Sequence, residues 1–106
     1  MPKYLIKASY TAEGVKGVLK DGGSKRRAAA EAAVKSTGGK LEAFYFAFGD
    51  ADALVIVDAP DNASIAAASM AIGASGLVTA KTVVLLTPEE VDQAVKKGAT
   101  YTPPGR

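Results

Sequence analysis

The stretch that decides the fold runs from Leu41 to Asp58 and reads LEAFYFAFGDADALVIVD. It contains two runs of β-forming residues, Leu41 to Phe48 and Ala53 to Asp58. Between them lies Gly49-Asp50-Ala51-Asp52, which has the composition of a tight turn. The stretch therefore predicts a β-hairpin at the centre of the chain.

Both faces of this hairpin are expected to be apolar, because successive side chains of a strand point to opposite faces. A sheet with one wet face would instead alternate apolar and polar residues. We therefore expect helices of the same chain to cover one face, and a partner subunit or a bound apolar ligand to cover the other. The predicted rows are Phe44, Phe46 and Phe48 against Leu41, Ala43, Tyr45 and Ala47, and Leu54 and Ile56 against Val55 and Val57.

The composition restricts the chemistry that the chain can perform. The 106 residues fit one domain, and 13 basic against 11 acidic residues give a net charge of +2, too small to indicate nucleic-acid binding. The chain has no cysteine, histidine or tryptophan, so it lacks a thiolate nucleophile, the usual neutral-pH base and the common zinc and haem ligands. We expect no cofactor and no metal.

The remaining pattern predicts two more strands and four helices. No apolar run reaches the roughly 20 residues that span a bilayer, and the first residues lack the apolar core of a signal peptide. A cytoplasmic protein without a membrane partner is expected. The strands are Lys3 to Tyr10 and Thr79 to Leu86, and the helices are Ala12 to Lys20, Lys25 to Thr37, Ala63 to Ala74 and Pro88 to Lys97.

Polar residues ahead of each helix predict how the helices begin. Thr11, Ser24 and either Asp61 or Asn62 are expected as amino-terminal caps. Thr87-Pro88-Glu89-Glu90 has the residues of a capping box, with proline at the first helical position.

The order of elements is that of an α+β, ferredoxin-like βαββαβ domain with the first helix in two pieces and an additional C-terminal helix. We expect a four-stranded antiparallel sheet with helices on one face. Residues 1–98 should form the domain, and residues 99–106 an extended or flexible tail. The other face of the sheet projects to about 400 Å², near the limit for a soluble monomer. Face-to-face pairing of two sheets in a dimer or higher homo-oligomer would bury it.

The chain carries several short motifs, which are Tyr10-Thr11, Glu13-Gly14, Ser24-Lys25-Arg26, Gly38-Gly39-Lys40, Phe44-Tyr45, Gly49-Asp50-Ala51-Asp52 and Ala59-Pro60-Asp61. In their order and spacing these motifs resemble the GYD-domain family over roughly residues 3 to 92. The resemblance implies a ferredoxin-like domain that pairs as a dimeric α/β barrel, in a family of small bacterial and archaeal proteins of unknown function. One position departs from the family's Gly-x-Tyr-Asp turn, because Ala51 stands where the tyrosine would be, so a role of that ring does not transfer.

The first candidate site is the basic segment Gly22-Gly23-Ser24-Lys25-Arg26-Arg27. Free amide groups and three cations at the start of a helix suit a phosphate or carboxylate. The alternative is a solvated helix end whose arginines pair with carboxylates. Arg26 and Arg27 lie near the expected inward stripe of the helix, which is formed by Ala30, Ala33, Val34 and Thr37.

Two further sets of polar residues are candidates. Asp50 and Asp52 could share a proton or hold a hard cation, or they could be ordinary turn residues with Asp52 accepting backbone N–H groups. The second set would face a small ligand between sheet and helices or between paired sheets, or else lie at the surface. It comprises Lys7, Tyr10, Glu42, Tyr45, Asp58 and Lys81.

Three functions stay open. The chain could be a non-enzymatic homo-oligomer that binds a small ligand or another protein. It could be a cofactor-free enzyme of the dimeric α/β barrel kind, a monooxygenase or isomerase, which would need a closed pocket of at least about 300 Å³. It could also be an anion sensor that uses the segment from Ser24 to Arg27.

Overall fold

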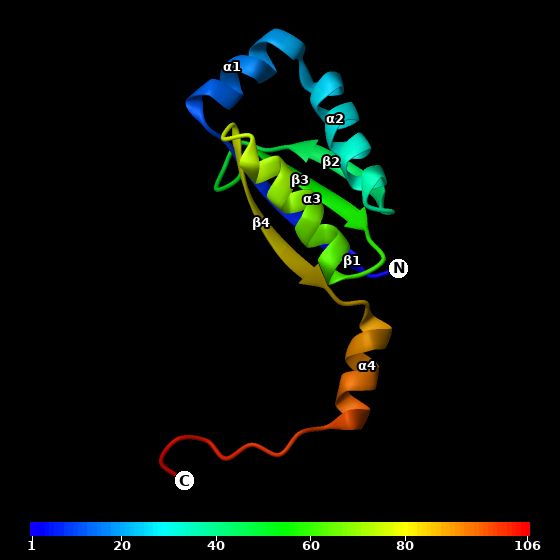
Figure 1. Cartoon of the computed structure of the whole chain (residues 1–106). Helices are drawn as coiled ribbons and strands as arrows, with labels where there is room; N and C mark the ends of the chain where they lie inside the picture. The colour runs from blue at the N-terminus through cyan, green and yellow to red at the C-terminus, as the bar shows by residue number, and fades with distance from the viewer.

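The computed structural model describes all residues, 1–106. Three helices form one layer and a four-stranded sheet forms the other, while the last helix stands apart from both (Figure 1). In chain order the elements are β1 (Lys3–Tyr10), α1 (Ala12–Asp21), α2 (Gly23–Ser36), β2 (Lys40–Phe46), β3 (Ala53–Asp58), α3 (Asn62–Ala74), β4 (Val78–Leu85) and α4 (Pro88–Lys97).

The sheet has the strand order β2-β3-β1-β4, and every neighbouring pair is antiparallel. β1 is central, with Lys3 paired to Asp58 of β3 on one side and to Leu85 of β4 on the other. This is the ferredoxin-like arrangement with α1 and α2 together in the place of its first helix. The predicted fold class is confirmed.

The core lies between the sheet and helices α2 and α3. Small residues of α2 bring this helix close to the sheet, and Val34 supplies its one buried side chain, as the predicted stripe required. Ile65 and Ala68 are the buried side chains of α3. The one polar atom of Tyr4 is satisfied, because its hydroxyl donates to Oδ1 of Asn62 at 2.6 Å. The main cluster is Tyr4, Ile6, Val34, Val55, Val57, Ala59 and Ile65.

A β-bulge in β2 overturns one predicted side-chain direction. Leu41 pairs with Val57 and Ala43 pairs with Ile56, so Glu42 is an extra residue on the β2 side. The extra residue reverses the alternation, and Leu41 faces the helices and packs against the core. Its predicted place beside Ala43 on the opposite face was wrong.

The predicted row of phenylalanines is divided. β2 ends at Phe46 instead of Phe48, and the Ala47 N–H donates to the Asp52 carbonyl at 2.9 Å across the loop. Phe44 packs against the core, Phe46 is 42 % exposed and Phe48 is fully exposed in the loop. The hairpin therefore supplies one core phenylalanine instead of three.

Two of the predicted helix caps are confirmed and one is wrong. Thr11 Oγ1 accepts from the Gly14 N–H at 3.2 Å, and Asp61 Oδ1 accepts from the Ser64 N–H at 2.8 Å. Ser24 is no cap, because α2 begins at Gly23 and Ser24 lies inside its first turn. Gly22 joins the two helices with a φ of 81°, which glycine adopts without steric cost.

Helix α4 has the predicted capping box of Thr87 and Glu90 but contributes no buried residue. It projects away from the sheet, and residues 99–106 continue beyond it as an extended segment (Figure 1). Val91 and Val95, one helical turn apart, are both exposed. No helix in the structure has the length and apolar character needed to cross a lipid bilayer.

Candidate functional site

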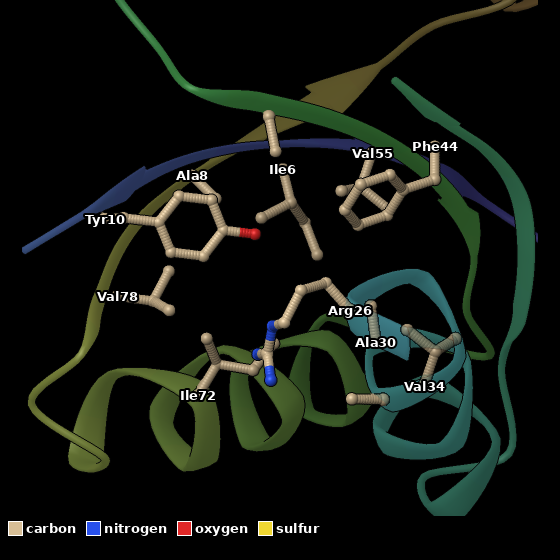
Figure 2. Close-up of a pocket in the computed structure, with 12 residues that line it drawn as sticks. Ile6, Ala8, Tyr10, Arg26, Ala30, Val34, Phe44, Val55, Ile72 and Val78 are labelled. Atoms are coloured by element: carbon tan, nitrogen blue, oxygen red, sulfur yellow. The ribbon is translucent and has the colours of Figure 1, made fainter. Parts of the chain in front are cut away.

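A cavity of about 90 Å³ lies between the sheet and helices α2 and α3. Eleven of its twelve lining residues are apolar or aromatic, and the twelfth is Arg26 (Figure 2). Strands β1, β2, β3 and β4 supply its roof, and the two helices supply its floor. The lining comprises Ile6, Ala8, Tyr10, Arg26, Ala29, Ala30, Val34, Phe44, Ala53, Val55, Ile72 and Val78.

Arg26 and Tyr10 bring polar groups into this apolar space. The guanidinium of Arg26 enters from α2, and the hydroxyl of Tyr10 points into the same cavity from the end of β1 (Figure 2). Neither group has a hydrogen-bond partner within the chain. The ion pairs of the chain join Lys3 to Glu42 and Asp58, Lys16 to Glu13, and Lys35 to Glu31.

Tyr10 is positioned from two sides. Its backbone N–H donates to Oδ2 of Asp52 at 2.9 Å, which ties the end of β1 to the hairpin loop. Its ring stacks on Phe46 with centroids 6.5 Å apart, and Phe46 meets Phe44 edge-on at 5.2 Å. These contacts fix the direction of the Tyr10 hydroxyl, because an aromatic ring packed on its neighbours has few alternative rotamers.

The other members of the predicted basic segment lie elsewhere. Arg27 points to a separate groove of about 400 Å³ at the edge of β2, which it shares with Glu31, Glu42 and Tyr45. Ser24 and Lys25 are exposed and line neither hollow. The structure thus places Arg26 with Tyr10, and Arg27 with Tyr45, on different sides of α2.

The two aspartates of the hairpin loop point to different surroundings. Asp52 holds the Tyr10 backbone and lines a groove of about 400 Å³ that also contains Phe46 and Phe48. Asp50 lies in a hollow of about 330 Å³ with Lys7 and Lys81. No cluster of three or more acidic side chains forms anywhere in the structure. Gly49, at the start of the turn, has open space around it.

The face of the sheet opposite the helices carries an apolar centre between two charged ends. Along β1 and β3 its residues alternate with the buried residues of the helix face, and no element of the chain covers it (Figure 1). Its apolar centre comprises Leu5, Ala43, Leu54, Ile56, Val83 and Leu85.

One charged end of this open face is an ion-pair cluster. Lys3 Nζ lies 2.8 Å from Asp58 Oδ1 and 2.8 Å from Glu42 Oε2. The hydrogen bond to Asp58 has the larger effect and that to Glu42 the smaller, and together they raise the pKa of Lys3 above its ordinary value. At the other end Lys7 stands directly opposite Lys81.

Sequence reasoning found Arg26 and Tyr10 separately but did not place them together. The spacing of four residues from Arg26 to Ala30, and again from Ala30 to Val34, was the signal that turned Arg26 inward. Ile72 and Val78 close the cavity, but Ile72 was expected only as a residue of its helix, and Val78 lies one residue before the predicted start of the last strand. Ser9 and Thr79, which line the hollow around Asp50, were not singled out, although strand alternation places them there.

The fold and the site define a class of protein, the two-layer ferredoxin-like domain with one open sheet face. The family model described as the GYD domain matches residues 4–95, so the chain belongs to the GYD domain family, whose function is unknown. The resemblance inferred from the short motifs is confirmed. No curated protein and no solved structure matches the chain.

Proposed function

We propose that the protein is a homo-oligomeric binding module in which copies of the chain pair through their open sheet faces. The observation that carries this proposal is the uncovered apolar centre around Leu54, Ile56 and Val83, with Val83 42 % exposed. Burying such side chains contributes about 25 cal/mol per Å² of apolar surface. Water is therefore a less favourable neighbour for this face than a second copy.

The charges at the two ends of the open face support a two-fold pairing. Glu42 and Asp58 together with Lys3 and Lys40, which pairs with Asp58, sum to −2 + 2 = 0 at one end. Lys7, Lys81 and Asp50 sum to +2 − 1 = +1 at the other. A two-fold axis that lays the sheets end over end brings the neutral end of each copy, with its two carboxylates, onto the basic end of its partner. The reverse orientation would place the two basic ends against each other, and the repulsion between like charges disfavours it.

The area of the sheet face favours a further contribution from α4. Two faces of about 400 Å² each total less than the roughly 1,200–2,000 Å² of a stable interface. Val91 and Val95 form an apolar stripe on α4, and Leu86 precedes it, all three exposed. Contact of this segment with the partner would extend the interface beyond the sheet.

Sedimentation velocity tests the pairing. We expect the wild type to sediment as a dimer or higher oligomer at micromolar concentration. Ile56→Lys places a charge in the centre of the face and should give a folded monomer. Ala32→Lys, at an exposed position of α2, should sediment like the wild type. A well-folded wild-type monomer at these concentrations would contradict the proposal.

The proposed module also binds a small molecule or an anion. The support is the pair of unpartnered polar groups, Arg26 and Tyr10, at one cavity. Ser24, Lys25, Arg27 and Tyr45 are the remaining candidate ligand residues. A thermal-shift screen of phosphates, nucleotides and carboxylates tests this, since a ligand at a hundredfold excess over its dissociation constant adds about 2.7 kcal/mol. No shift for any of them would remove the ligand from the proposal.

The alternative is a cofactor-free enzyme of the monooxygenase or isomerase type. The interior cavity of about 90 Å³ is smaller than the pocket of about 300 Å³ that such an enzyme needs. The specific observation in its favour is the hollow of about 330 Å³ lined by Lys7, Lys81 and Asp50, which pairing would roof over. A structure of the oligomer discriminates the two, because the enzyme requires a closed chamber there and the binding module does not.

A further inference from the structure

We propose that the cavity between the sheet and helices α2 and α3 binds a short aliphatic monocarboxylate. Arg26 would hold the carboxylate and the Tyr10 hydroxyl would donate to one of its oxygens. This inference rests on the ligand-binding part of the proposed function. It is independent of the pairing, because the cavity lies on the helix side of the sheet and the paired face on the other (Figures 1 and 2).

The charge of the ligand follows from the two polar groups. Arg26 is the one charged residue of an otherwise apolar lining, and the ion pairs of the chain leave it free. Placing a guanidinium among apolar side chains costs free energy unless a hydrogen-bond acceptor replaces the water molecules that would solvate it. Its planar fork matches both oxygens of a carboxylate.

Tyr10 strengthens the choice of a carboxylate over a neutral ligand. Its hydroxyl is free, and its ring is held by Phe46, so it offers a donor in the same space as Arg26. A neutral apolar compound would offer no acceptor for the hydrogen bonds of these two donors. A phosphate dianion would bring more negative charge into this apolar space than one arginine neutralises.

The size of the cavity limits the rest of the ligand. A volume of about 90 Å³ corresponds to about three water molecules at about 30 Å³ each. That space suits a carboxylate with a short alkyl chain, such as propionate, and excludes an aromatic acid or a nucleotide. Ile6, Val55 and Ile72 provide apolar walls for the alkyl chain, as small-ligand sites usually do.

The first experiment is a titration of the full-length ¹⁵N-labelled protein with propionate, followed by NMR chemical shifts. We expect saturable shifts at residues around the cavity, such as Ala8 and Val55. Propionamide, which has the same shape without the charge, should bind at least about tenfold more weakly, since bonds to charged groups are the stronger ones. Equal binding of the two compounds, or no saturable shift with propionate, would overturn the proposal.

The second experiment uses matched variants. Arg26→Met keeps an apolar stem and removes the guanidinium, and it should abolish propionate binding. Arg27→Met, one position along the helix and outside the cavity, should bind like the wild type. Tyr10→Phe keeps the stacked ring and should bind about tenfold more weakly. Circular dichroism establishes that each variant is folded.

The outcomes separate this inference from the proposed function. Propionate binding retained in Arg26→Met overturns the carboxylate site. If phosphate or a neutral compound binds in the cavity and propionate does not, the carboxylate as ligand class is overturned. The proposed function as a binding module is then retained. Sedimentation of the same variants reports on the pairing alone, because neither Arg26 nor Arg27 lies on the open face.

Discussion

At the scale of single residues, a glycine decides how α1 is seated on the rest of the domain. A Cβ built on Gly14 would lie 2.1 Å from the carbonyl oxygen of Leu77, a distance that no real side chain tolerates. The neighbouring Thr11 N–H donates to that same oxygen at 3.0 Å. The start of α1 therefore meets the segment before β4 backbone to backbone, and only glycine permits this approach.

Substituting Gly14 tests this contact. We expect Gly14→Ala to lower the free energy of unfolding by about 1–3 kcal/mol, because the added methyl must displace a backbone. Gly17→Ala is the matched control in the same helix, since its Cβ would have no neighbour within 4 Å. It should raise stability by about 0.5–1 kcal/mol. Urea denaturation compares the two, and equal stabilities would contradict the close approach.

The cap of α3 gives a prediction for pH dependence. The hydrogen bonds from Ser64 to the carboxylate of Asp61 lower the pKa of Asp61 below its ordinary value of 3.8. Because the folded pKa lies below the unfolded one, the stabilisation is complete above about pH 4 and is lost as the pH falls through the folded pKa.

Asp61→Asn isolates this effect, because asparagine still caps a helix but does not titrate. The loss of stability between about pH 5 and pH 2 should be smaller in Asp61→Asn than in the wild type. Urea midpoints at the two pH values measure it. An identical loss in both proteins would show that Asp61 contributes nothing to the acid sensitivity.

At the scale of the element, α2 depends on one side chain for its attachment to the sheet. Beyond Arg26 its inward stripe consists of alanines apart from Val34, which is 2 % exposed and belongs to the core cluster. We expect Val34→Ala to cost about 2 kcal/mol, from lost burial and the space left behind. Lys35→Ala, exposed at the next position, should change stability by less than about 0.5 kcal/mol. Thermal unfolding of both variants measures the difference, and equal effects would contradict this role of Val34.

The elements themselves were predictable because their signals are local. The alternation in β1, the helical spacing of Ile65, Ala68 and Ile72, and the capping box before α4 each lie within one short segment. All of these appear in the structure within a residue or two of the predicted bounds. The bulge at Glu42 was not predictable, because it is a property of the pairing between β2 and β3. It changed the face of Leu41 without changing the extent of the hairpin.

At the scale of the whole molecule, the chain is elongated, with extents of 56 × 33 × 22 Å. The length comes from α4 and the segment after it, which leave the two-layer body (Figure 1). A ten-residue helix with no buried residue is marginal in water, even with a good cap. Contact with a partner subunit would stabilise it.

Deleting residues 88–106 tests the role of this segment. In samples dilute enough to be monomeric, the truncated chain should unfold at the same temperature as the full chain, because no buried residue is removed. At micromolar concentration it should self-associate more weakly, since Val91 and Val95 are lost from the proposed interface. Sedimentation equilibrium measures the second effect. An unchanged association constant would show that pairing uses the sheet alone.

The candidate site was predicted in its parts and not in its arrangement. Tyr10 and Arg26 are separated by three helix boundaries in the sequence, and only the packing of α2 over the sheet brings them to one cavity. Arg27 and Tyr45 meet at a different groove for the same reason. Side chains that share a ligand are neighbours in space, and sequence spacing carries little information about that.

The sequence by itself determined the class of fold, since its periodicities, caps and turn residues act within single elements and agree with one another. It also determined that the central hairpin is apolar on both faces. Tertiary structure alone decided which face stays open, where the bulge turns Leu41 inward, and which basic residue enters the cavity. These features depend on how elements pair and pack across long sequence separations, which no local pattern specifies.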